Sequence, residues 1–189
     1  MKTKNIMIVG VGGQGTLIAS RILGGIATHA GLDVKLSEVH GMAQRGGSVV
    51  TFVRYGDQVE EPIVEPGCAD VLIAFERLEA KRYAHFLAPT GVLIVNDQRI
   101  DPMPVLIGAA EYPEHIIEDI EKEHKVYRAD AASIARELGN PRCFNVVILG
   151  MAAKHMDYKV EDWMDVIEHT VKPSTVEINK KAFFAGYNL

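Results

Sequence analysis

A glycine-rich turn lies near the start of the chain, in the stretch IVGVGGQGTLIASRIL from Ile8 to Leu23. Gly10, Gly12 and Gly15 have the spacing G-x-G-x-x-G and stand between an apolar run and a segment with helical periodicity. Such glycines permit a tight turn, and they let a pyrophosphate approach backbone N–H groups at a helix N-terminus. Three interpretations stay open: a dinucleotide site, a contact with another anion or a partner at this loop, and a purely structural turn.

A nicotinamide site also requires an acidic residue at the end of the second strand, to bind the ribose hydroxyls. Glu38 is the candidate, but it comes late after the turn and leads directly into His40 and Gly41. Another enzyme class uses a similar turn to bind ATP for adenylation, and it usually adds a C-x-x-C zinc pair that this sequence lacks. Both enzyme interpretations are therefore weakened.

A second glycine-bearing stretch, EVHGMAQRGGSV, follows the second expected strand. Because the carboxyl ends of the strands carry the ligand crevice of an open α/β sheet, we expect this loop to face the first turn. Arg45 can form a bidentate bond to carboxylate or phosphate, and His40 can donate or accept a proton near neutral pH. The alternative is a solvated, hairpin-like connection. The candidate residues of the loop are His40, Gln44, Arg45, Gly46 and Gly47.

The elements that must position these loops follow from the apolar pattern. The runs ADVLIAFE and GVLIVND are apolar on both faces and are separated by a helical segment, which is typical of buried parallel strands. Asp130 is expected to cap a following helix, and Ser174 with Glu177 predicts a capping box for the last helix. We predict one domain over residues 1–189, an α/β fold of three layers. Its sheet is Rossmann-like and mainly parallel, with helices on both faces.

Composition narrows the class further. With a net charge of −5 and no run rich in lysine or arginine, the 189-residue chain lacks the basic surface that nucleic acid or an anionic membrane requires. Cys68 and Cys143 are its two cysteines, too few for an iron–sulfur cluster or a structural zinc site. No apolar run approaches the roughly 20 residues of a membrane span. We expect a cytoplasmic protein without a membrane segment.

The two glycine stretches together resemble the gamma-subunit family of 2-oxoacid:ferredoxin oxidoreductases. The resemblance extends over nearly the whole chain, through ADVLIAFERLEA, FNVVILGMAA and NKKAFFAGY, and HGMAQRGG is its most specific part. The version of the loop with His-Gly-Met-Ala-Gln resembles the indolepyruvate branch.

The resemblance implies an accessory subunit of an enzyme that oxidatively decarboxylates a 2-oxoacid, here an indolepyruvate or aryl pyruvate, to an acyl-CoA. Electrons then pass to ferredoxin. The cofactors it implies are thiamine diphosphate, Mg²⁺ and 4Fe-4S clusters, all in a larger partner subunit, with coenzyme A as co-substrate. This chain would be inactive alone, would help to close the active site and receive coenzyme A, and could self-associate when isolated.

Carried onto this sequence, the resemblance places the first turn opposite the second loop across a shared cavity. Arg45 would contact the carboxylate of the 2-oxoacid or a phosphate of coenzyme A, or would pair with the partner subunit. No residue of this chain is expected to be catalytic or to bind a metal. A free-standing NAD(P)- or flavin-dependent enzyme and a pure scaffold remain the alternatives. The residues of the first turn are Gly12, Gly13, Gln14 and Gly15.

Two other side chains raise the question of a site. Asn145 lies in an apolar helical segment, where an amide bonded to a neighbouring backbone group is favoured over a substrate contact. Cys68 follows Pro66 and Gly67 in a loop, and a small buried thiol is favoured there over a reactive one.

Overall fold

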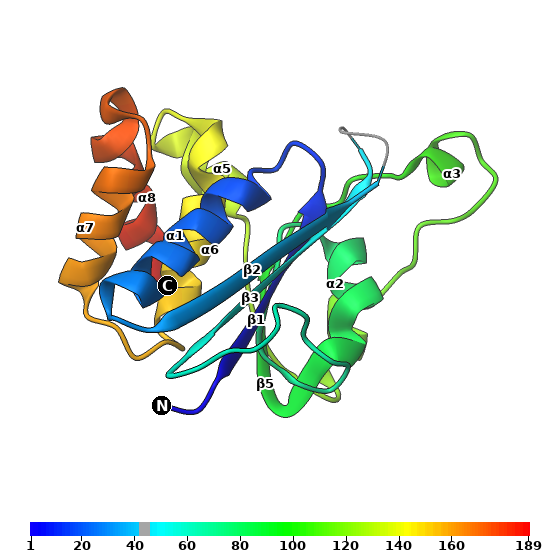
Figure 1. Cartoon of the computed structure of the whole chain (residues 1–189). Helices are drawn as coiled ribbons and strands as arrows, with labels where there is room; N and C mark the ends of the chain where they lie inside the picture. Colours follow the sequence, from blue (N-terminus) through cyan, green and yellow to red (C-terminus); the bar gives the residue numbers. More distant parts are fainter. Residues whose placement is uncertain (42–45) are drawn as a thin grey trace.

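A mixed β-sheet organises the chain. The computed structural model describes residues 1–41 and 46–189, and over these residues the sheet has six strands in the order β2-β3-β1-β4-β5-β6 (Figure 1). The strands are β1 (Lys4–Val11), β2 (Asp33–His40), β3 (Ser48–Gly56), β4 (Ala69–Ala74), β5 (Leu87–Asn96) and β6 (Lys125–Ala129).

The predicted mainly parallel sheet is confirmed, with one exception. Strands β1, β4, β5 and β6 pair in parallel, whereas β3 lies antiparallel between β2 and β1. The register places Gly10 opposite Val49 and Val11 opposite Ser48. The chain that enters β3 therefore lies beside the chain that leaves β1, at the edge where the parallel strands end.

Helices cover both faces of the sheet, as predicted. On one face α1, α5, α6, α7 and α8 enclose an apolar core that includes Ile8, Ile73 and Trp163. On the other face α2 and α4 pack over Met7 and Leu72, while α3 projects on an arm away from the sheet (Figure 1). Within the described ranges no helix combines the length and apolar character needed to cross a membrane. The helices are α1 (Thr16–His29), α2 (Arg77–Tyr83), α3 (Met103–Leu106), α4 (Ile116–Glu121), α5 (Ala131–Glu137), α6 (Phe144–Ala153), α7 (Val160–Thr170) and α8 (Val176–Tyr187), with 3-10 turns η1 (Ala84–Phe86), η2 (Pro141–Cys143) and η3 (Pro173–Thr175).

Of the two helix starts that local signals predicted, one is confirmed and one is wrong. The Asp130 carboxylate accepts a hydrogen bond from the Ser133 N–H at 2.9 Å, so it caps α5 as expected. The prediction of a capping box at Ser174 was wrong. Ser174 lies within η3, which ends at Thr175, and α8 begins at Val176 without a side-chain cap. The prediction that the Cys68 thiol is buried was also wrong, since this side chain is exposed just before β4.

Candidate functional site

The two glycine stretches contact each other at the carboxyl edge of the sheet. The Gly12 N–H donates to the Gly47 carbonyl oxygen at 2.8 Å, and the Gly46 N–H donates to the Gly12 carbonyl oxygen at 3.5 Å. The structure thus brings together the turn after β1 and the end of the connection from β2 to β3. Gln44 and Arg45, the two central candidates of the second stretch, lie outside the described residues.

Two residues of the first turn have a left-handed backbone. Gly13 has a φ of 101° and Gly15 has a φ of 85°, and residues with a side chain rarely adopt such positive values. Gly13 is exposed, with open space where a Cβ would lie, whereas a Cβ on Gly15 would come within 2.5 Å of Asn145 Nδ2. The backbone of Gly13 is therefore exposed to solvent, whereas Gly15 is closely packed against Asn145.

Gln14 points back into the fold. Its Oε1 accepts a hydrogen bond from the Val11 N–H at 2.7 Å, and its Nε2 donates to the Phe75 carbonyl oxygen at 3.0 Å. A further contact at 3.4 Å joins Nε2 to Gln98 Oε1. The amide therefore ties the end of β1 to the end of β4, a supporting position behind the turn.

Some backbone N–H groups at and before the turn are engaged within the chain. Val11 donates to the Gln14 side chain, Gly12 to Gly47, and the Gln14 N–H to the Val11 carbonyl oxygen at 3.1 Å. A dinucleotide site uses the backbone of such a turn for the pyrophosphate. These internal bonds weigh against that use of the loop.

Glu38 is likewise held by neighbours. Its Oε2 accepts hydrogen bonds from Thr51 Oγ1 at 3.1 Å and Thr16 Oγ1 at 3.4 Å. Thr16 begins α1, so the carboxylate connects the outer strands to the start of that helix. Its place beside the helix end, bonded to two hydroxyls, does not favour the ribose contact that a nicotinamide site requires.

His40 closes β2 and stands at the mouth of the second stretch. Its side chain is exposed, and Nδ1 lies 3.1 Å from the Gly41 carbonyl oxygen. The imidazole therefore faces outward at the edge where the two glycine stretches meet.

A buried carboxylate anchors the exit of the second stretch, and no sequence pattern had indicated it. Glu79 of α2 is 3% exposed, accepting a hydrogen bond from Ser48 Oγ at 2.5 Å and another from Arg82 Nη1 at 2.8 Å. Burial raises the pKa of the Glu79 carboxyl above its ordinary value. Ser48 directly follows the two glycines, so α2 holds one end of the loop in place.

The neighbouring strand ends are held by amide and ionic contacts. Asn96 is fully buried, with Oδ1 accepting from the Ala131 N–H at 3.1 Å and Nδ2 donating to the Phe75 carbonyl oxygen at 3.1 Å. Asp97 accepts from Arg77 Nε at 2.6 Å. Asn145 donates from Nδ2 to the Gly15 carbonyl oxygen at 3.2 Å, which supports the backbone-bonding interpretation of this amide.

The implied clusters and metal do not fit this chain. Two cysteines cannot supply the four thiolates of a 4Fe-4S cluster, and Cys143 is buried while Cys68 is exposed. In the part of the chain that the structure describes, no group of three or more His, Cys, Asp or Glu side chains could hold a metal ion.

Solved structures share this arrangement of sheet and helices. Pyruvate oxidoreductase subunit PORC from Thermotoga maritima matches with a TM-score of 0.76 and 24% identity, over 100% of this chain and 97% of that one. A 2-oxoglutarate:ferredoxin oxidoreductase from Magnetococcus marinus matches with a TM-score of 0.73 and 18% identity, over 100% of this chain but 31% of that one. The fold therefore occurs both as a separate subunit and within a longer chain.

Sequence comparison gives the family. The family model for pyruvate ferredoxin/flavodoxin oxidoreductase matches residues 5–189. Indolepyruvate oxidoreductase subunit IorB from Archaeoglobus fulgidus is 44% identical over 97% of this chain and 94% of its own length, and the IorB of Pyrococcus horikoshii is 42% identical over 98% and 95%. The chain belongs to the pyruvate ferredoxin/flavodoxin oxidoreductase family, which confirms the resemblance drawn from the two glycine stretches.

Proposed function

We propose that this chain is the small subunit of a 2-oxoacid:ferredoxin oxidoreductase that acts on indolepyruvate or a related aryl pyruvate. The similarity to two subunits named for indolepyruvate, over nearly the full length of both partners, supports the substrate class. The reaction is oxidative decarboxylation of the 2-oxoacid with coenzyme A, giving an acyl-CoA, CO₂ and two electrons for ferredoxin.

The cofactors of this reaction belong to a larger partner subunit in our proposal. Thiamine diphosphate with Mg²⁺ stabilises the carbanion and 4Fe-4S clusters carry single electrons, and this chain has too few cysteines for a cluster. We place the complex in the cytoplasm, because two unpaired cysteines fit a reducing compartment.

The paired glycine stretches carry the proposal for how this subunit contributes. The hydrogen bond from the Gly12 N–H to the Gly47 carbonyl oxygen, 2.8 Å long, joins the two loops into one surface. Gln14 and Glu79 support that surface from behind, and Gly13 offers exposed backbone at its front. A preformed surface of this kind closes a partner's active site without an ordering cost at each turnover.

We assign coenzyme A and the 2-oxoacid to the same surface. The Magnetococcus marinus structure, which contains this fold within a longer chain, carries 2-oxoglutarate, coenzyme A and succinyl-CoA. Arg45 is proposed to bind an anion there, the 2-oxoacid carboxylate or a phosphate of coenzyme A, with an ion pair to the partner subunit as the alternative.

Purification of the tagged chain from its host under anaerobic conditions tests the proposal. A co-purifying iron–sulfur subunit, with reduction of a ferredoxin substitute that depends on indolepyruvate and coenzyme A, is the expected result. A lone protein that titrates tightly with NAD(H) or a flavin would instead establish the free-standing enzyme.

Arg45→Ala, compared with Arg21→Ala on the exposed face of α1, separates the roles of the loop. Loss of activity in an intact complex supports a ligand contact. Loss of assembly supports a purely scaffolding role for the loop. Activity and assembly equal to those of Arg21→Ala would exclude both a ligand contact and a scaffolding role for Arg45.

A further inference from the structure

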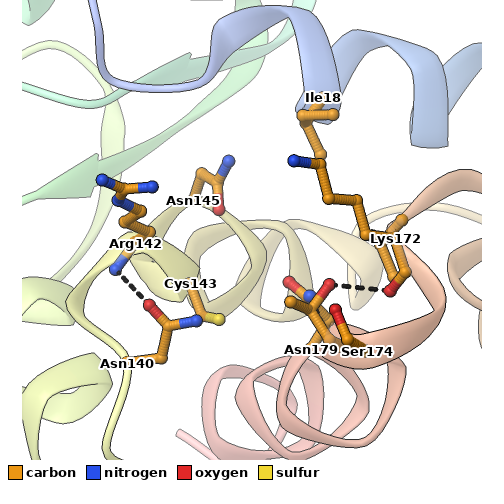
Figure 2. A pocket seen from close by; sticks show the side chains of 10 residues that line it. Ile18, Asn140, Arg142, Cys143, Asn145, Lys172, Ser174 and Asn179 are labelled. Carbon is orange, nitrogen blue, oxygen red and sulfur yellow. Dashed lines mark hydrogen bonds between the residues drawn. The ribbon is translucent and has the colours of Figure 1, made fainter.

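A cavity lies on the helical face of the sheet, beside the end of the first glycine turn, where its lining residue Asn145 bonds to the Gly15 carbonyl oxygen. It has a volume of about 550 Å³ and opens between the N-terminal ends of α1, α6 and α8 (Figure 2). Ile18 contributes from α1, Cys143 and Asn145 from the start of α6, and Thr175 and Asn179 from the start of α8. Its volume lies within the range of about 300–1,000 Å³ that is typical of sites for small molecules.

Two cationic side chains flank this cavity. Figure 2 shows Arg142 on one side and Lys172 reaching in from the other. Neither takes part in any ion pair among the described residues, and none of the described residues that line the cavity is acidic. No acidic side chain among the described lining residues neutralises the charges of Arg142 and Lys172.

Two buried amides add hydrogen-bond donors. Asn145 is 5% exposed and Asn179 is 7% exposed, and both line the cavity. Asn145 Nδ2 donates to the Gly15 carbonyl oxygen at 3.2 Å, and Asn179 Nδ2 donates to the Thr175 carbonyl oxygen at 2.8 Å. An amide nitrogen carries two hydrogens, so each group keeps one N–H without an acceptor in the described part of the chain.

The helix ends reinforce the same polarity. Among the residues that the structure describes, α1, α6 and α8 begin without a side-chain cap, at Gly15, Cys143 and Thr175 respectively. Each N-terminal end carries partial positive charge, which favours an anion within its first turn. In α8 the first turn already contains Glu177, which does not line the cavity. The cavity thus combines two cations, two spare amide donors and three helix ends of the same sign.

We propose that this cavity binds the phosphate group of a small phosphorylated ligand. A phosphate group presents several oxygens of high charge, and a guanidinium, an amine and amide N–H groups are all suitable donors to such oxygens. The cavity is larger than a phosphate alone requires, which favours a ligand with a phosphate at one end. The inference does not rest on the proposed function, because it concerns binding by the chain itself.

Titration calorimetry on the full chain tests the proposal with two probes, inorganic phosphate and adenosine 3′,5′-bisphosphate. At low ionic strength we expect both to bind, and we expect added salt to weaken binding because the charges are solvent-accessible. Similar affinity for both probes would assign the site to free phosphate, whereas tighter binding of the bisphosphate would assign it to a larger phosphorylated ligand. Absence of heat for both probes up to about 10 mM would overturn the proposal.

Single substitutions locate the site. Lys172→Ala and Arg142→Ala should each weaken binding about tenfold, the usual cost of losing a hydrogen bond to a charged group. Lys181→Ala, on an exposed position of α8 that does not line the cavity, removes the same charge and should leave affinity within about twofold. Equal weakening in all three variants would show only a general charge effect and would contradict the site.

Amide chemical shifts give a second measurement, independent of the substitutions. On addition of inorganic phosphate to the ¹⁵N-labelled chain, the largest shifts should come from the first turns of α1, α6 and α8. Shifts confined to other parts of the chain would refute the assignment even if the calorimetry shows binding.

Discussion

The side-chain amide of Asn145 donates a hydrogen bond to the carbonyl oxygen of Gly15, 130 residues earlier in the chain and 3.2 Å away. This contact joins the start of α6 to the end of the first glycine turn. It leaves no room at Gly15, where an added Cβ would lie 2.5 Å from Asn145 Nδ2.

Gly15→Ala should therefore destabilise the protein by about 1–3 kcal/mol, because it combines strain at a φ of 85° with a collision. Urea unfolding measures the change in free energy. Gly13→Ala is the matched control, since it has the same kind of backbone strain but open space. An equal loss in both variants would mean that the packing against Asn145 contributes nothing.

The helices α6 and α8 touch through their backbones at Gly186. A Cβ at this position would lie 1.8 Å from the Val147 carbonyl oxygen, so Gly186→Ala must push the two helices apart. We expect a loss of about 2–3 kcal/mol in the free energy of unfolding.

Gly24→Ala, in the interior of α1, is the control with the opposite expected sign. There a Cβ would meet Val34 Cγ1 at an ordinary 3.8 Å, and alanine in a helix interior should add about 0.5–1 kcal/mol. Thermal unfolding of the two variants side by side gives the comparison. A Gly186→Ala protein as stable as the parent would disprove the close helix contact.

The pH dependence of stability should carry a contribution from Glu79. Burial raises the pKa of this carboxyl above its ordinary value of 4.5. The stabilising contribution is then complete below pH 4.5 and is lost as the pH rises through the pKa of the folded state. Glu79→Gln keeps the shape but cannot ionise, so its stability should fall less than that of the parent as the pH rises from 4.5.

Thermal melts of both proteins across that interval measure the difference. The exposed Glu65→Gln serves as the control for a general effect of charge, and it should follow the parent. Parallel curves for the parent and Glu79→Gln would show that Glu79 keeps an ordinary pKa in the folded protein.

The arm that carries α3 exposes apolar side chains. Met103, Leu106 and Ile107 are 66%, 65% and 70% exposed, and such a group favours association when it is left uncovered. We expect the isolated chain to self-associate at high concentration. The double variant Leu106→Ser with Ile107→Ser should reduce that association in sedimentation equilibrium.

Leu189→Ser is the control, because Leu189 is similarly exposed, at 62%, but does not belong to the arm that carries α3. If the two variants associate to the same extent as the parent, the arm is not the surface involved.

Element types were predictable along most of the chain because their signals are local. Continuous apolar runs predicted buried strands, and the segment from Cys143 to Met156, apolar nearly all round, predicted a buried helix. The Asp130 cap was predictable too, since a cap depends on residues three positions apart. The start of α8 was not predictable to the residue. The 3-10 turn η3 precedes this helix and moves its start by one residue, and such a turn has no distinct sequence pattern.

Within the candidate site, the sequence indicated the two glycine stretches but not what supports them. The contact of Ser48 with Glu79 joins residues 31 positions apart, and the contact of Gln14 with Phe75 joins residues 61 apart. Neither pairing leaves a periodic or spacing signal. The bonds of the Gln14 amide to Val11 and Phe75 were therefore visible only in the structure.

By itself the sequence determined the α/β class, the two glycine stretches and the absence of a cluster-forming cysteine set, because each depends on residue type and short spacing. Only the tertiary structure decided that β3 lies antiparallel between β2 and β1, and that this position sets Gly47 against Gly12. It also decided that one cavity is surrounded by the beginnings of three helices and by Arg142 and Lys172, two cations without an ion pair among residues 1–41 and 46–189. Strand order and helix convergence depend on how distant segments share one core, and local preferences carry no information about that choice.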